Sequence, residues 1–228
     1  MPRMASPLRN ELEELRLAVY RGFAETGRAP SASALATRLG LAPAQVEDGL
    51  QALATLRHVV LDGDGRIAMA HPFSAVPLGF AVMGATTLWW GGCAWDSFAL
   101  PHVLPDEPEV LVSTRCPACA APLAWVVRRD APPEGDEVAH FLTPVAHMWD
   151  EILHTCGHQR LFCGTDCVEA WLERTGHERG SILDLATLWR LAQGWYGGRL
   201  ERGYTRREPV EAAEYFREVG LTGAFWGL

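Results

Sequence analysis

The sequence predicts an α+β protein with two domains: three helices and a strand pair in residues 1–70, then a mixed α/β domain in residues 71–228. Three observations support this prediction. Apolar residues recur at helical spacing near the start of the chain. A Gly-Asp-Gly turn then joins two short apolar runs, as in a β-hairpin. Beyond residue 70, runs of β-branched and aromatic residues alternate with Pro and Gly.

The first domain is predicted from the faces and ends of its helices. A helix over residues 8–27 carries apolar side chains at helical spacing, at Leu12, Leu15, Leu17, Val19 and Phe23. Ser31 is a typical start for a second helix, which Gly40 ends. A third helix is expected over 43–55, and two strands flank the Gly-Asp-Gly turn within 58–70. Three helices followed by a hairpin are typical of a winged-helix-like domain.

The charge of this first domain argues against DNA binding. Residues 1–70 hold eight Arg and eight acidic residues, and the whole chain has a net charge of −8. The helix over 43–55, which would be the recognition helix, contains Glu47 and Asp48 but no Arg. Nucleic-acid binding needs cations against phosphate, so we expect a structural role and no DNA partner.

The second domain is predicted as strands first and helices after. Strands are expected in the runs HPFSAVPLGFAV, TTLWWGG, EVLVST and APLAWVVRR. After a polar loop at 130–137, helices are expected at WDEIL, CVEAWLERTG and ILDLATLWRLAQGWYGG. The tail EPVEAAEYFREVGL has an amphipathic pattern, and we expect it to pack back on the domain. The apolar stretch 74–90 is short for a membrane span and broken by Pro and Gly, so we expect a buried strand pair and no membrane association. The start of the chain lacks the apolar run of a signal peptide, which indicates the cytoplasm.

Six cysteines in a reducing compartment indicate metal ligands or reactive groups rather than disulfides. Two pairs have zinc-ligand spacing, Cys116-Pro-Ala-Cys119 and Cys163-Gly-Thr-Asp-Cys167. Together the four would form a tetrahedral four-sulfur site suited to zinc. The second pair enters a predicted helix and resembles the C-terminal half of treble-clef zinc modules. The alternative is that all four are buried as small hydrophobic residues.

The other two cysteines stand beside groups that can act on a thiol. Cys93 lies three residues before Asp96 in the run LWWGGCAWDSF, and Cys156 lies between His154 and His158. Cationic or hydrogen-bonding neighbours favour the thiolate, which is the form that attacks or binds metal. If the first pair belongs to one helical turn, its thiol and carboxylate share a face. The alternatives are buried core thiols and, for Asp96, a helix cap.

These motifs resemble those of the organomercurial (alkylmercury) lyase family, from about residue 10 to about residue 200. Residues 93–96 match its Cys-x-x-Asp motif, and residues 156–158 match its Cys-x-His stretch. Cys116 stands where the family has a further, structural cysteine. The family also joins a winged-helix-like domain to a mixed α/β lyase domain, as predicted for this chain. Three cysteines are additions to the family pattern: Cys119, Cys163 and Cys167.

The resemblance implies a lyase that cleaves a carbon–mercury bond by protonolysis into a hydrocarbon and Hg(II). Cys93 and Cys156 would bind mercury as thiolates, and Asp96 would pass a proton from an incoming thiol to the leaving carbon. The substrate would be a small organomercurial, no organic cofactor would be needed, and small thiols or a mercuric reductase would take the Hg(II). Gly91 and Gly92 would allow close backbone approach. Four aromatic residues would exclude water and accept the organic group: Trp89, Trp90, Trp95 and Phe98.

Three other functions stay open. One is a non-enzymatic protein that binds a soft metal, zinc or mercury, through its cysteines. Another is an enzyme of the same fold with a different substrate. The weakest is a metal-responsive transcription regulator, because the first domain is neutral. Asp96→Asn separates a lyase from a binding protein, since only a lyase would lose turnover.

Overall fold

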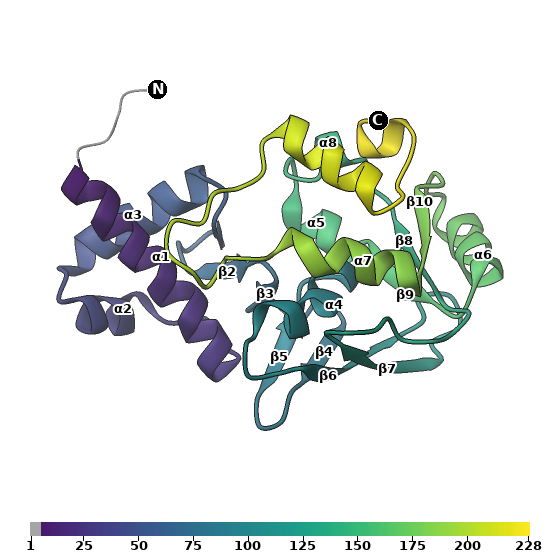
Figure 1. The fold of residues 1–228 in the computed structure, drawn as a ribbon, viewed down its shortest axis with the longest axis horizontal. Helices are drawn as coiled ribbons and strands as arrows, with labels where there is room; N and C mark the ends of the chain where they lie inside the picture. Colours follow the sequence, from purple (N-terminus) through teal and green to yellow (C-terminus); the bar gives the residue numbers. More distant parts are fainter. Residues whose placement is uncertain (1–5) are drawn as a thin grey trace.

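The computed structural model describes residues 6–228. Residues 1–5, which begin the predicted first domain and the segment without a signal-peptide pattern, lie outside the described residues. The three predicted N-terminal helices are confirmed (Figure 1): α1 (Ser6–Thr26), α2 (Ala32–Leu39) and α3 (Pro43–Thr55). The Ser31 hydroxyl accepts a hydrogen bond from the Ala34 N–H, and Gly40 ends α2 with a φ of 66°, a conformation that suits glycine.

The strand pair after α3 is also confirmed, and its sheet continues beyond residue 70. β1 (Val60–Leu61) and β2 (Ile67–Ala70) begin a seven-stranded antiparallel sheet with the order β1-β2-β3-β5-β4-β6-β7. The remaining strands are β3 (Phe73–Ser74), β4 (Phe80–Met83), β5 (Leu88–Gly91), β6 (Glu109–Arg115) and β7 (Pro122–Arg128). Because β2 pairs with β3, the sheet crosses the boundary predicted at residue 70. That boundary and the winged-helix-like character stay predictions.

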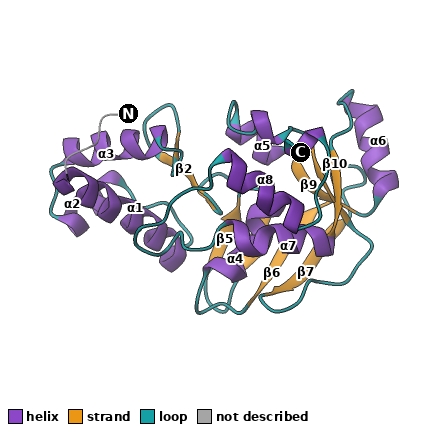
Figure 2. Cartoon of the chain, turned by 45° about the horizontal axis from the view of Figure 1, so that its top comes forward, coloured by secondary structure: helices purple, strands orange, loops and turns teal. Residues whose placement is uncertain are grey.

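Helices cover one face of this sheet. α4 (Ala94–Val103) packs on the sheet and α7 (Leu185–Trp195) packs on α4 (Figure 2). The prediction of a buried strand pair within 74–90 is therefore wrong in part, because β4 and β5 are buried on the covered face alone. Strand side chains alternate between faces, and the outer face carries an exposed apolar row across four adjacent strands: Leu88, Met83, Leu111 and Val126.

A second, three-stranded antiparallel sheet has the order β10-β8-β9. Its strands are β8 (Val138–Phe141), β9 (Gln159–Phe162) and β10 (Ser181–Asp184). β10 corrects the helix predicted from residue 182, since these residues pair with β8 and α7 begins only at Leu185. The Asp184 carboxylate then accepts the Thr187 N–H at 2.6 Å and caps α7. A partner strand that is distant in the sequence outweighs the local helical pattern here.

The other predicted helices are present with changed ends. The helix predicted at WDEIL begins only at Ile152, as α5 (Ile152–Gly157). α6 (Thr165–Thr175) confirms the helix predicted at CVEAWLERTG, and the amphipathic tail forms α8 (Pro209–Glu218). Two short 3-10 helices complete the set in residues 6–228, η1 (Val145–His147) and η2 (Ala224–Trp226). Within the same residues, none of the helices has the length and apolar character required to span a membrane.

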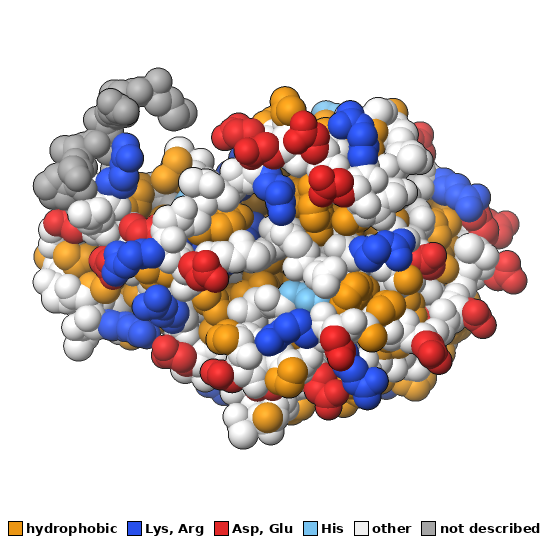
Figure 3. Space-filling model, in the orientation of Figure 1, with side chains coloured by type: hydrophobic (Ala, Val, Ile, Leu, Met, Phe, Trp, Pro, Cys, Tyr) orange, Lys and Arg blue, Asp and Glu red, His pale blue; other side chains and the backbone are white. Residues whose placement is uncertain are grey.

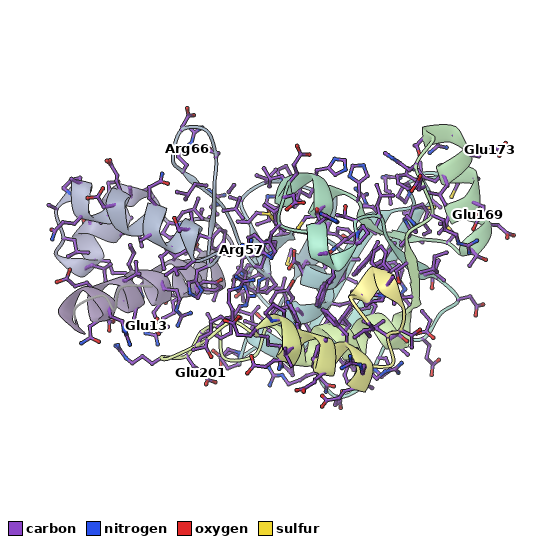
Figure 4. The ribbon with its side chains drawn as sticks, turned by 90° about the horizontal axis from the view of Figure 1, so that it is seen from above. Glu13, Arg57, Arg66, Glu169, Glu173 and Glu201 are labelled. Atoms are coloured by element: carbon purple, nitrogen blue, oxygen red, sulfur yellow. The ribbon has the colours of Figure 1, made fainter. Side chains whose placement is uncertain are left out.

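The chain after α7 returns to the first helix. Arg16 of α1 donates to the carbonyl oxygens of Arg199 and Glu201 at 2.7 and 2.6 Å. Glu13 accepts a backbone N–H of the same returning segment at 2.8 Å. Figure 4 shows Glu13 and Glu201 near each other, and Arg57 between the N-terminal helices and the rest of the chain. The returning segment thus ties the N-terminal helices to the second domain.

Candidate active site

The thiol and carboxylate of the Cys-x-x-Asp motif lie at the start of α4. Cys93 is the N-cap: its Sγ accepts the Asp96 N–H at 3.4 Å, and its thiol donates to Asp96 Oδ2 at 3.2 Å. The alternative reading of Asp96 as the cap is therefore wrong. Cys93 is 1% exposed and Asp96 is 0% exposed. The motif places a thiol against a carboxylate inside the protein.

Gly91 and Gly92 allow β5 to pass close to this turn. A Cβ at Gly91 would collide with the Ser97 side chain. A Cβ at Gly92 would collide with Met69 and with the Asp96 carboxylate. The predicted close backbone approach is confirmed, since both positions have room for glycine alone.

Cys156 reaches the same carboxylate from α5. Its Sγ, a ring nitrogen of His71 and a carboxylate oxygen of Asp96 lie within 4.8 Å of one another. Cys156 is 2% exposed, and both Cys93 and Cys156 are free thiols. Two cysteines from distant parts of the sequence therefore meet at one buried carboxylate.

The surroundings of these two thiols favour their protonated forms. Burial raises the pKa of Cys93 well above its usual range, and Cys156 and the Asp96 charge raise it further. The hydrogen bond with Cys93 lowers the pKa of Cys156, but burial and Asp96 together outweigh it and the pKa is raised. Both thiols therefore stay protonated until the sulfur binds a metal or a base accepts the proton.

His154 and His158 do not activate Cys156. Their rings contact each other, with centroids 4.1 Å apart, and His158 also contacts Trp171 and His177. Neither lines the cavity that Cys156 faces. The expected lowering of the thiol pKa by its flanking histidines is wrong, because residues two apart point to nearly opposite sides of a helix.

His71 is a site residue that sequence reasoning missed. Its Nδ1 lies 3.2 and 3.1 Å from the two carboxylate oxygens of Asp96. Its Nε2 is buried, and no group in residues 6–228 forms a hydrogen bond with it. His71 precedes β3 and belongs to no recognisable motif. The strand pairing of β3 with β5 brings it to the start of α4.

A cavity of about 620 Å³ opens onto this group. Cys93, Asp96, Cys156 and His71 all line it. Most of its remaining wall is aromatic or apolar: Trp95, Met148, Trp149, Trp195, Tyr196, Phe216 and Trp226. Such a wall suits an apolar organic group and excludes water from the polar atoms.

Of the four aromatic residues predicted to line this space, Trp95 alone does so. Trp89 points to the other side of the chain and donates its ring N–H to the Phe23 carbonyl oxygen at 2.9 Å. Trp90 is 37% exposed on the outer face of the sheet. Phe98 packs against an aromatic ring of β7. Alternation along β5 puts Trp90 on the outer face. Trp89 lies on the opposite, buried face, but its ring contacts α1 instead of the cavity.

Four arginines also line the cavity: Arg57, Arg199, Arg206 and Arg207. Arg57 and Arg206 lie over the Trp149 ring, at 5.6 and 5.2 Å from its centre. Arg199 is 5% exposed and donates to the Tyr20 hydroxyl of α1 at 3.2 Å and to the His71 carbonyl oxygen at 2.6 Å. Arg199 therefore connects the N-terminal helices to the residue that contacts Asp96.

The four remaining cysteines form a separate group, the four-cysteine cluster (Cys116, Cys119, Cys163 and Cys167). Their sulfur atoms all lie within 4.8 Å of one another, and none of them lines the cavity. Burial raises the pKa of Cys116, but nearby backbone N–H groups outweigh it and bring the pKa to about 7. Burial and the neighbouring thiols raise the pKa of Cys163 to about 12.

Known proteins share both the sequence pattern and the fold. The alkylmercury lyase family model matches residues 73–197, which include Cys93, Asp96 and Cys156. The solved "Crystal structure of the mercury-bound form of MerB2" superposes with a TM-score of 0.60 and 20% sequence identity, covering 82% of this chain and 96% of that chain. At that identity the likeness shows a common fold. A search of curated proteins found no match.

Proposed function

The chain belongs to the alkylmercury lyase family, and we propose that it cleaves a carbon–mercury bond by protonolysis at Cys93, Asp96 and Cys156. One observation carries the proposal: two buried free thiols meet at one buried carboxylate, at the wall of an aromatic cavity. Thiols supply soft ligands for a soft metal. The carboxylate supplies a route for the proton that the leaving carbon needs.

The stoichiometry requires two protons to leave the thiols. R–Hg⁺ and two thiols give R–H, a mercury bisthiolate and one further proton. The Cys93 thiol already donates to Asp96 Oδ2, so its proton passes to the carboxylate as the sulfur binds mercury. The second thiolate, from Cys156, increases electron density on mercury and weakens its bond to carbon. Asp96 then delivers its proton to that carbon, and the hydrocarbon leaves.

We propose that His71 takes the second proton. Its Nδ1 faces the Asp96 carboxylate, and its Nε2 forms no hydrogen bond with any residue in 6–228, so the second nitrogen is free to accept a proton. A ring nitrogen of His71 also lies within 4.8 Å of the Cys156 sulfur. His71 would thus orient Asp96 through one nitrogen and accept the Cys156 proton at the other.

The product Hg(II) would leave by thiol exchange. Both sulfurs that hold it are buried, so the acceptor must enter the cavity or take the metal at its mouth. A small external thiol fits this requirement, and a mercuric reductase would act after it or in its place. Because both catalytic thiols must stay reduced, we propose the cytoplasm as the compartment.

We propose a structural role for the winged-helix-like domain at residues 1–70. Arg199 joins Tyr20 of α1 to the His71 backbone, so α1 supports the catalytic group from outside. On the face drawn in Figure 3, basic and acidic side chains of the N-terminal helices are interspersed. A DNA-binding surface would concentrate cations instead.

Benzene release from phenylmercury tests the proposed reaction. With excess thiol, we expect the purified chain to produce benzene over many turnovers, above the rate with thiol alone, as measured by gas chromatography. Protein that binds mercury without releasing benzene would contradict the lyase proposal and favour a soft-metal binding protein.

The proposed proton transfer by His71 predicts a distinct pair of variants. We expect His71→Ala to lower kcat about 100-fold, at the lower end of the usual range for acid–base groups, with a smaller change in KM. Added imidazole should restore part of the rate, because the vacated space adjoins the cavity. Asp96→Asn is the control, since imidazole cannot replace its carboxylate. A His71→Ala variant with the full rate, or one that imidazole leaves unchanged, would contradict proton transfer at His71.

A further inference from the structure

The four-cysteine cluster joins two parts of the fold that are distant in the sequence. Cys116 and Cys119 belong to the turn between β6 and β7, in the seven-stranded sheet. Cys163 follows β9 of the second sheet, and Cys167 lies in the first turn of α6. The cluster therefore sits where the two sheets meet.

The sulfur positions fit a tetrahedral metal site. A zinc ion with four thiolate ligands at about 2.3 Å separates the sulfurs by about 3.8 Å. The Cys119 and Cys163 sulfurs are 3.6 Å apart, and all four lie within 4.8 Å of one another. All four are free thiols, so no pair among them is consumed in a disulfide. Four soft ligands, with no fifth His, Cys, Asp or Glu grouped with them in residues 6–228, favour a closed structural site.

The backbone around the first pair has the form of a metal-binding turn. Cys116 N–H donates to the Ala121 carbonyl oxygen and Ala120 N–H donates to the Cys116 carbonyl oxygen, both at 2.9 Å. Ala120 has a φ of 61°, in the left-handed region that a side chain rarely adopts. This tight turn directs Cys116 and Cys119 to the same side.

Arginines provide positive charge around the cluster. Arg174 of α6 donates to the carbonyl oxygens of Pro117 and Ala118 at 2.6 and 2.9 Å. Arg115 donates to the Ala120 carbonyl oxygen at 3.0 Å. Zinc with four thiolates carries a net charge of about −2, which nearby guanidinium groups offset. Neutral thiols would gain little from these cations.

We propose that Cys116, Cys119, Cys163 and Cys167 bind one structural zinc ion that joins the two sheets. The ion would also fix β9, which directly follows the helix that carries Cys156. This site is independent of mercury chemistry, because none of the four cysteines lines the cavity. Loss of the zinc ion would make the position of Cys156 less rigid, although the ion itself would not contact mercury.

Metal analysis of the full chain tests the proposal. Protein made with zinc in the medium and purified under reducing conditions should contain about one zinc per chain by mass spectrometry. Cys119→Ser and Cys163→Ser should each lose that zinc and melt at a lower temperature, since structural zinc contributes to folding free energy. Cys93→Ser is the matched control and should keep its zinc. Replacement of zinc by Co(II) should give the absorption of a tetrahedral thiolate site.

Two results would overturn the assignment. One is reduced, folded wild-type protein that holds no zinc and develops no Co(II)–thiolate absorption after reconstitution with either metal. The other is zinc that Cys93→Ser loses and Cys119→Ser keeps, which would place the ion at the catalytic thiols. Zinc content and Co(II) absorption of the wild-type protein test the zinc site even if a cluster variant fails to fold. They also use no organomercurial, so their failure is distinct from failure of benzene release.

Discussion

Replacement of Asp96 by Asn should abolish most of the carbon–mercury cleavage and leave mercury binding nearly intact. Asn keeps the size of the buried side chain but cannot take the Cys93 proton or deliver one to carbon. Acid–base groups contribute about 100- to 10,000-fold, so we expect kcat for benzene release to fall about 1,000-fold. Hg(II) bound per chain, measured after dialysis against a competing thiol, should stay at the wild-type value.

Asp106→Asn is a suitable control, because Asp106 is exposed in the loop after α4 and lies outside the cavity. It removes the same charge from the chain and should keep the wild-type rate. Near-normal turnover in Asp96→Asn would show that the proton reaches carbon by another route. Loss of both turnover and mercury binding would show that Asp96 is primarily a support for Cys93.

Replacement of either Cys93 or Cys156 by Ser should remove both cleavage and tight mercury binding. A hydroxyl is a poor ligand for mercury, so a single remaining thiolate would neither hold the metal firmly nor activate its bond to carbon. We expect kcat/KM to fall at least about 100-fold, which corresponds to roughly 2.7 kcal/mol of transition-state stabilisation. Benzene release and dialysis with Hg(II) measure the two losses.

A double variant of Cys93 and Cys156 tests whether the two thiols bind the same mercury atom or act independently. If both thiols bind the same mercury atom, Cys93→Ser combined with Cys156→Ser should lose little more activity than either single variant. Multiplicative losses would indicate independent roles. The thermal melting temperature serves as the control for folding.

Sequence patterns that depend on only a few neighbouring residues, such as helix caps, predict local structure well. Ser31 and Gly40 predicted both ends of α2, because capping depends on contacts within one turn. The apolar run from residue 182 predicts a helix, but its first residues form β10. Its pairing partner, β8, lies some forty residues earlier in the chain, and the local sequence does not indicate which distant strand will pair with it.

The sequence by itself determined that Cys93 and Asp96 stand three residues apart after two glycines and that two cysteine pairs have metal-ligand spacing. Those features depend on spacing along the backbone. Tertiary structure alone decided that Cys156 and His71 meet Asp96 and which aromatic rings face the cavity. Such contacts arise from strand pairing and helix packing between segments far apart in the chain, where the orientation of each side chain depends on its partner.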